Sequence, residues 1–166
     1  MSTFTSWLIK QARRRIGPSP VESLAMGIGR GLLAGVAGTA AISLSQAIEM
    51  KLTKREPSTA PADAAGKVLG IRPRHLAGKA RFAHIVHWAY GTTWGLFRAA
   101  LGGRPRRRLW AALAQLAAIQ TAALVMLPKL GVAPPLTEWE PAEIGTEILH
   151  HAVYSIAADA TYRSLA

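Results

Sequence analysis

The sequence LWAALAQLAAIQTAALVML, residues 109–127, runs for 19 positions without a charged side chain. A helix needs about 20 apolar residues to cross the ~30 Å hydrocarbon core of a bilayer. Basic residues precede this segment at 104–108, and Pro128 follows it. We therefore predict a membrane-spanning helix here and interpret the rest of the chain outward from it.

Three other segments, 24–48, 81–101 and 144–165, have the length and composition of spanning helices. The last is the least hydrophobic, because it contains Glu147 and Asp159, and it would insert only when packed against its neighbours. A soluble bundle is the alternative, but its helices would carry charged outer faces at helical spacing, and 109–127 carries none. The predicted fold class is all-α, an integral membrane four-helix bundle formed by residues 21–166.

The composition agrees with a membrane protein. Half of the 166 residues are hydrophobic and 17% are charged, against roughly 25% in a typical soluble domain. The net charge is +11, and the basic residues gather outside the apolar segments. This pattern favours a lipid bilayer with anionic headgroups as the partner, rather than nucleic acid. The chain has no cysteine, which excludes disulfides, thiolate metal sites and thiol nucleophiles.

Two short surface elements are predicted beside the spans. Residues 1–20 contain Trp7 and a run of basic residues, which is typical either of an interfacial helix on an anionic leaflet or of a basic tail. Residues 61–69 form a candidate amphipathic helix, because Pro61 suits the first helical position and Gly70 suits a helix end.

Four spans place both termini on the same side of the membrane. Dense clusters of Lys and Arg lie on that side, at 10–15 and 104–108. Because such clusters stay in the cytoplasm, we predict a multi-pass protein of the bacterial inner membrane with both termini cytoplasmic. On this terminal side Arg30, Arg98 and Asp159 could pair, and we interpret such a group as structural.

Glycines repeat along the first and second spans at the spacing that lets helix backbones approach closely in a membrane. The partner of this glycine ridge is either another helix of the chain or a second copy, so a homo-oligomer or another membrane-protein partner stays open. The predicted packing residues are Gly27, Gly31, Gly35, Gly38, Gly91 and Gly95.

Histidine, acidic and tyrosine residues gather near the other end of the spans. The motif His87-x-x-Tyr90 in the second span is echoed by His151-x-x-Tyr154 in the fourth, which indicates two duplicated helix pairs. The end of the first span and the starts of the second and fourth share one membrane surface, so their polar residues should meet. The predicted cluster comprises Gln46, Glu49, His84, His87, Tyr90, Glu147, His150, His151 and Tyr154.

Four interpretations of this cluster remain open. The spacing Glu147-x-x-His150 occurs in metal-binding helical bundles, which points to zinc or iron, and a single zinc ion fits better than a dinuclear centre. Haem between His87 and His151 is the second, and proton or small-solute transport is the third. The fourth is interhelical hydrogen bonding in a scaffold or accessory subunit. No catalytic residue is predicted. The candidate metal ligands are Glu49, His84, His87, Glu147, His150 and His151.

The overall pattern resembles the YagU-like family of small, uncharacterised bacterial inner-membrane proteins. The resemblance runs from Gly31 nearly to the C-terminus, and it departs at Tyr154-Ser155, where a Tyr-Gly pattern is expected. It implies a compact helical fold in the inner membrane and no particular reaction. The motifs that carry it are Gly31-Leu-Leu-Ala-Gly35-x-x-Gly38, His87-Trp88-Ala89-Tyr90-Gly91, Leu130-Gly131 with Pro134-Pro135, and His151-x-x-Tyr154.

Overall fold

A computed structural model describes residue 6 and residues 17–102 and 108–165. The all-α prediction is confirmed for these residues. They form five α-helices and a short 3-10 helix, which are α2 (Pro20–Thr53), α3 (Ala60–Leu69), α4 (Leu76–Ala100), α5 (Arg108–Lys129), η2 (Leu136–Glu138) and α6 (Pro141–Ser164). Most of the predicted interfacial segment at 1–20 and most of the basic turn at 104–108 lie outside the described residues.

Local sequence signals account for where the helices begin and end. At the start of α2, the Glu22 backbone N–H donates to the Ser19 hydroxyl at 3.2 Å, and the Ser19 N–H donates to the Glu22 carboxylate at 2.8 Å. This reciprocal arrangement satisfies backbone donors that a helix start otherwise leaves unpaired. The predicted short helix is confirmed as α3, which ends at Gly70 in a left-handed conformation with φ of 69°.

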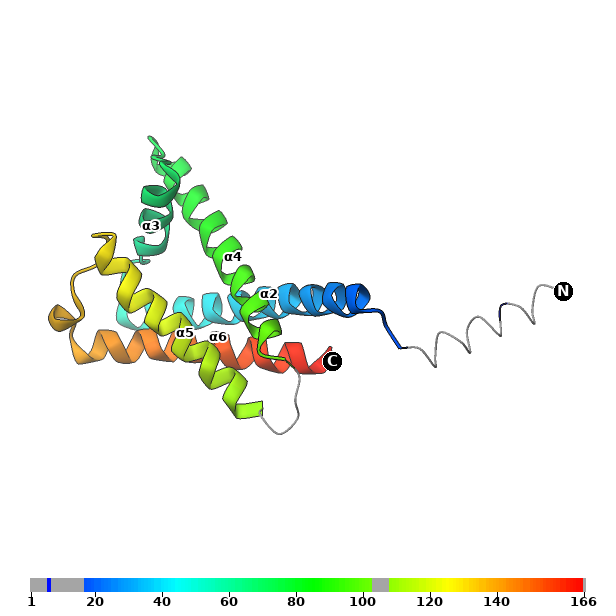
Figure 1. The fold of residues 1–166 in the computed structure, drawn as a ribbon. Helices are drawn as coiled ribbons and strands as arrows, with labels where there is room; N and C mark the ends of the chain where they lie inside the picture. Colours follow the sequence, from blue (N-terminus) through cyan, green and yellow to red (C-terminus); the bar gives the residue numbers. More distant parts are fainter. Residues whose placement is uncertain (1–5, 7–16, 103–107, 166) are drawn as a thin grey trace.

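The four long helices form two crossing layers (Figure 1). Helices α2 and α6 lie side by side and antiparallel, and α4 and α5 cross them obliquely. Helix α4 packs mainly on α2, α5 packs mainly on α6, and α4 and α5 touch each other over a short length. Helix α3 packs against the first part of α4. The α2–α6 pair is therefore the common support of the other long helices.

Two of the described helices are long and apolar enough to cross a membrane, judged by length and composition alone. They are α2 and the segment Trp110–Lys129 of α5, which agree with the first and third predicted spans. Helices α4 and α6 do not meet this criterion, because polar residues such as Arg98 on α4 and Asp159 on α6 lower their mean hydropathy. By this criterion, two of the four predicted spans are apolar enough to cross a membrane, and the spans at α4 and α6 stay a prediction.

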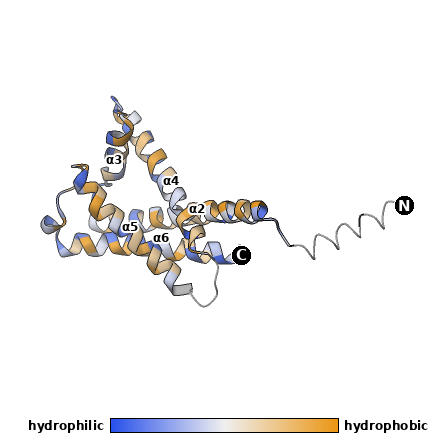
Figure 2. Ribbon diagram, viewed as in Figure 1, coloured by the Kyte–Doolittle hydropathy of each residue, from blue (hydrophilic) through white to orange (hydrophobic). Residues whose placement is uncertain are grey.

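Large polar side chains lie in the interior beside a small hydrophobic cluster of α2, α5 and α6, and many large apolar side chains lie on the outer surface. The largest fully buried side chains are all polar, namely Arg98, His150, Gln115, Thr39 and Ser155. Large aliphatic and aromatic side chains lie outside, and the exposed fraction is 63% for Leu44, 70% for Trp110 and 64% for Ile156. Figure 2 shows hydrophobic residues along the outer length of α2 and α5. Polar and charged side chains of this size are seldom fully buried in a water-soluble domain unless they are paired.

Candidate functional site

The close contact between α2 and α4 depends on glycine. A Cβ atom at Gly31 would lie 2.8 Å from the carbonyl oxygen of Gly95, and a Cβ at Gly35 would meet the backbone of Thr92. A Cβ at Gly91 would meet the Thr39 side chain. Only glycine permits two helix backbones to approach this closely. At this contact the partner of the glycine ridge on α2 is therefore α4, a helix of the same chain.

Two members of the predicted ridge have other surroundings. A Cβ at Gly38 would lie 2.7 Å from the ring of Tyr154, so this glycine packs against α6 rather than α4. Around Gly27 there is nothing within 4 Å. Gly27 lies where α2 extends at its N-terminal end past the point where α4 crosses it, so its predicted role in packing stays a prediction.

His87 joins α4 to α2. Its Nε2 atom lies 2.8 Å from the Ser43 hydroxyl oxygen, and that hydroxyl also donates to the Thr39 carbonyl at 2.7 Å. A hydroxyl has a single proton, so the imidazole must be the donor in the bond with Ser43. His87 therefore acts as a hydrogen-bond donor between two helices.

His150 joins α6 to α2. Its Nδ1 atom lies 2.8 Å from the Ser45 hydroxyl oxygen, and its Nε2 atom lies 3.8 Å from the Glu49 carboxylate. Glu49 belongs more closely to Arg55, whose guanidinium donates to it from Nε and Nη2 at 3.2 and 2.8 Å. Glu49 lies just beyond the apolar segment 24–48.

His151 faces a different helix from His150. Its Nδ1 atom lies 2.7 Å from the Gln120 side-chain oxygen on α5, and its Nε2 atom lies 3.9 Å from the Glu147 carboxylate one turn earlier on α6. The amide oxygen is an acceptor, so His151 also acts as a donor between helices. His87 and His151 thus hold corresponding positions, since each bonds the long helix that precedes its own.

The two tyrosines of the repeated motif differ in their surroundings. Tyr154 is buried, and its hydroxyl donates to the Gly91 carbonyl on α4 at 2.6 Å. Tyr90 is 44% exposed and packs edge-on against Trp94. The structure therefore joins Tyr154 to the interhelical contacts and leaves Tyr90 at the surface.

An ion pair occupies the other end of the bundle. Arg98 on α4 contacts the Asp159 carboxylate on α6 at 2.7 Å through Nη2, and its guanidinium lies 4.4 Å from the centre of the Tyr162 ring. Arg163 contacts the second carboxylate oxygen at 2.9 Å. The predicted pairing of Arg98 with Asp159 is confirmed. The second cation is Arg163 rather than Arg30.

Glutamines of α5 complete the interior, and sequence reasoning missed them. Gln115 is fully buried and donates to the Trp94 carbonyl on α4 at 3.1 Å, and Gln120 accepts from His151. The signal was present, because these are the two strongly polar residues of an otherwise apolar segment. Ser43 and Ser45 were missed as well, since single hydroxyls are too common in apolar helices to stand out.

Two further members of the predicted cluster lie apart from it. His84 is exposed, and its ring lies near that of Trp88 at an angle of 56°, with 6.2 Å between ring centres. Gln46 is half-buried and makes none of the side-chain hydrogen bonds found among the described residues. The shared depth in the membrane was thus insufficient to predict contact, because the side chains leave their helices in different directions.

The candidate metal ligands do not converge. Among the residues that the structure describes, no three His, Asp or Glu side chains lie close enough to hold a metal ion. The six candidates take part in separate contacts. The two histidines of α6 face different helices, because His150 bonds α2 and His151 bonds α5. The predicted set was Glu49, His84, His87, Glu147, His150 and His151.

Comparison of the chain with protein-family models, with curated proteins and with solved structures gave no match. The resemblance to the YagU-like family therefore stays a prediction. A function for this chain has to be proposed from its own geometry.

Proposed function

We propose that this protein is a four-helix integral membrane scaffold or accessory subunit. One observation carries the proposal: polar side chains join the long helices in the interior, while the outward faces are aliphatic. The contacts run from α2 to α4, from α2 to α6, from α4 to α6, from α4 to α5 and from α5 to α6. A bundle surrounded by lipid needs such contacts, because lipid offers its interior polar groups no alternative partner.

Helices α4 and α6 span despite their charges because the charges meet inside the bundle. Arg98 and Asp159 neutralise each other there, and His87 and His151 donate hydrogen bonds to neighbouring helices. The helices have 25 and 24 residues, which gives about 36 Å each at ~1.5 Å per residue. That length exceeds a hydrocarbon core of ~30 Å. These helices are stable in the membrane as parts of the bundle rather than singly.

The corresponding contacts of His87 and His151 support the interpretation of two duplicated helix pairs. In each pair, a histidine of the second helix bonds a polar side chain of the first. The second pair has Gln120 where the first has Ser43, so the contact is kept while the partner differs.

Transport is the less favoured alternative. Arg98 and Arg163 surround the single carboxylate of Asp159 at one end of the bundle, which gives this group a formal charge of +1. A fixed positive charge opposes the passage of protons and other cations. The same arrangement suits a structural ion pair.

The test uses the absence of native cysteine. Single substitutions Ser58→Cys, Thr137→Cys and Ser164→Cys place a thiol in exposed positions at the two ends of the bundle. With cytoplasmic termini, a membrane-impermeant maleimide should label the first two in intact bacterial cells and the third only after the membrane is opened. The unmodified chain is the blank.

A matched variant distinguishes a spanning chain from a soluble one. Ile156→Cys lies on the outward face of α6, where the native side chain is 64% exposed. A lipid-covered Ile156→Cys should resist the impermeant reagent from both sides. Rapid labelling at this position, together with release of the protein by alkaline carbonate, would overturn the proposal.

A further inference from the structure

The corner between α3 and α4 is a compact surface feature, formed by residues 68–81. Gly70 closes α3, and the Ile71 backbone N–H donates to the Gly66 carbonyl at 2.9 Å. A Cβ at Gly66 would lie 2.9 Å from the Ile71 carbonyl oxygen, so the turn fits tightly against the end of α3. Pro73 then lies over Gly78 at the start of α4. The corner presents its side chains on a defined backbone.

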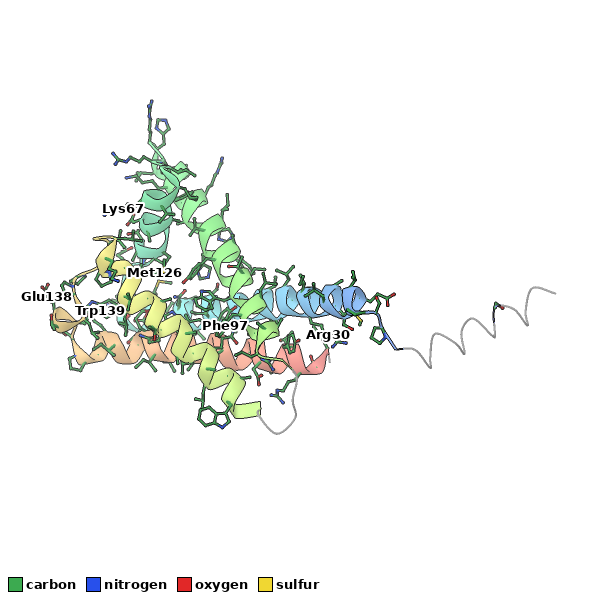
Figure 3. All side chains as sticks on the ribbon, viewed as in Figure 1. Arg30, Lys67, Phe97, Met126, Glu138 and Trp139 are labelled. Carbon is green, nitrogen blue, oxygen red and sulfur yellow. The ribbon has the colours of Figure 1, made fainter. Side chains whose placement is uncertain are left out.

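Lys67 fixes this corner to the rest of the bundle. Its ammonium group donates to the carbonyls of Leu130 and Gly131 at 2.6 and 3.0 Å, directly after α5 ends. Figure 3 shows Lys67 on α3, close to the final turns of α5. The positive charge also suits the negative C-terminal end of a helix. The corner is therefore held by α4 on one side and by the end of α5 on the other.

The corner is strongly cationic. It carries Arg72, Arg74, Lys79 and Arg81, all of them exposed. None of the four forms an ion pair with another described residue. The sequence contains no acidic residue from position 64 to position 137. Figure 3 shows long nitrogen-tipped side chains extending outward from this end of α3 and α4. The positive charge is left for an external anion.

Aliphatic side chains are interleaved with these basic ones. The exposed fraction is 85% for Leu76, 66% for Val68 and 62% for Leu69, and Ile71 is 44% exposed. Aliphatic and basic side chains on one exposed surface are typical of a segment that enters the interface of an anionic leaflet. A site for single-stranded nucleic acid would instead offer aromatic rings for stacking, and residues 68–81 contain no Phe, Tyr or Trp.

The place of the corner in the fold fits the same partner. Figure 1 shows it displaced to the side of the α2–α6 pair, near the end where α2 finishes and α6 begins. A feature in that position lies over the surrounding lipid rather than over the bundle. Its aliphatic side chains can then enter the leaflet while the basic ones stay at headgroup level.

We propose that the α3–α4 corner, residues 68–81, binds the phosphates of anionic lipid headgroups. The inference rests on the proposed membrane function. Each Lys or Arg near an anionic surface contributes roughly a fivefold gain in association. The four basic residues of the corner therefore give a strong preference for anionic over zwitterionic lipid around this part of the protein.

The experiment uses the full chain with the substitution Ala77→Cys, labelled with the environment-sensitive dye NBD. The protein is placed in lipid nanodiscs of phosphatidylcholine with an increasing fraction of phosphatidylglycerol. NBD emission should move to shorter wavelength as the anionic fraction rises. The triple substitution Arg72→Gln, Arg74→Gln and Lys79→Gln should raise the fraction needed for half of this shift severalfold, since three charges are removed.

Two matched controls locate the effect. Thr137→Cys carries the dye at an exposed position of η2 at the same end of the bundle, and its emission should be independent of lipid charge. The double substitution Lys51→Gln and Lys54→Gln removes exposed basic residues at the end of α2 and should leave the response at position 77 unchanged.

The outcomes separate this inference from the membrane proposal. Incorporation into nanodiscs is measured first, by co-elution of protein and lipid, and failure to incorporate would overturn the membrane proposal and the inference with it. Incorporation with an emission at position 77 that ignores phosphatidylglycerol would overturn the lipid inference alone. The same holds if inorganic phosphate or a DNA duplex produces the shift in discs of pure phosphatidylcholine.

Discussion

Arg98 shows how a single residue shapes the interior. Its side chain is 2% exposed, and three groups surround the guanidinium, namely the Asp159 carboxylate, the Tyr162 ring and the Gly102 carbonyl. A buried charge is stable only when it is paired and hydrogen-bonded. Asp159 is therefore the residue on which the stability of the α4–α6 contact depends most.

Removal of the carboxylate charge should be severe. We expect Asp159→Asn to lower the free energy of unfolding by about 3–5 kcal/mol, because it leaves the Arg98 guanidinium buried without a counter-ion. The double substitution Arg98→Met and Asp159→Leu should recover most of this loss. Unfolding of the detergent-solubilised protein, followed by circular dichroism, measures both. Arg163→Gln is the control, since its side chain is 40% exposed and surface pairs contribute at most about 1 kcal/mol.

The two tyrosines of the repeated motif give a matched pair. Tyr154→Phe removes the hydrogen bond to the Gly91 carbonyl and should cost about 0.6–2 kcal/mol, as other interhelical hydrogen bonds in membranes do. Tyr90→Phe removes an exposed hydroxyl and should change the same unfolding measurement very little. Equal losses in the two variants would contradict the different surroundings that we describe.

At the scale of helices, glycine spacing determines which elements can touch. Gly31, Gly35 and Gly95 bring the backbones of α2 and α4 together, while Gly38 receives the Tyr154 ring from α6. Helix α2 therefore uses one line of glycines for two partners in succession. Most of the glycine ridge on α2 is therefore covered by α4 and α6 of the same chain.

A methyl group at the crossing should disturb it. In Gly95→Ala the new Cβ would meet the Gly31 carbonyl and the backbone at Gly35, and overpacking of this kind costs about 1–3 kcal/mol. Gly27→Ala should be neutral or stabilising by up to about 1 kcal/mol, because its surroundings are open and alanine favours helix. The midpoint of thermal unfolding compares the two. A larger fall in the unfolding midpoint for Gly27→Ala than for Gly95→Ala would contradict the position at which α2 and α4 cross.

Much of the helical framework followed from local signals, and the arrangement of polar groups did not. Apolar length, Pro61 and Gly70 predicted the helices within a few residues, because these effects act along the chain. The histidines were assigned to one cluster because sequence gives depth and helix face but not the neighbour on that face. His150 and His151 show this directly, since adjacent residues bond α2 and α5.

At the scale of the molecule, the distribution of polar contacts supports the proposed scaffold rather than a cofactor site. The histidines serve three different helix pairs, so each is already engaged in the fold. A metal site would require them to leave these contacts and converge. The structure therefore favours a bundle stabilised by its histidines over one that uses them as ligands.

Elemental analysis tests this whole-molecule view. We expect purified protein to contain neither zinc nor iron in stoichiometric amount, and a chelator to leave its thermal unfolding unchanged. His87→Ala and His151→Ala should each lower stability by about 0.6–2 kcal/mol through loss of a hydrogen bond. Stoichiometric metal that is lost in these variants without loss of stability would establish a metal site instead.

The pairing of Arg98 with Asp159 also has a consequence for synthesis of the chain. The two residues are separated by 61 positions, so the guanidinium of α4 leaves the ribosome long before its carboxylate partner exists. Until α6 is made, α4 has an unneutralised charge that opposes its entry into lipid. In the proposed membrane bundle, α4 and α6 are therefore expected to insert together in a late step, and a nascent chain that stops before Asp159 should leave α4 without its counter-ion.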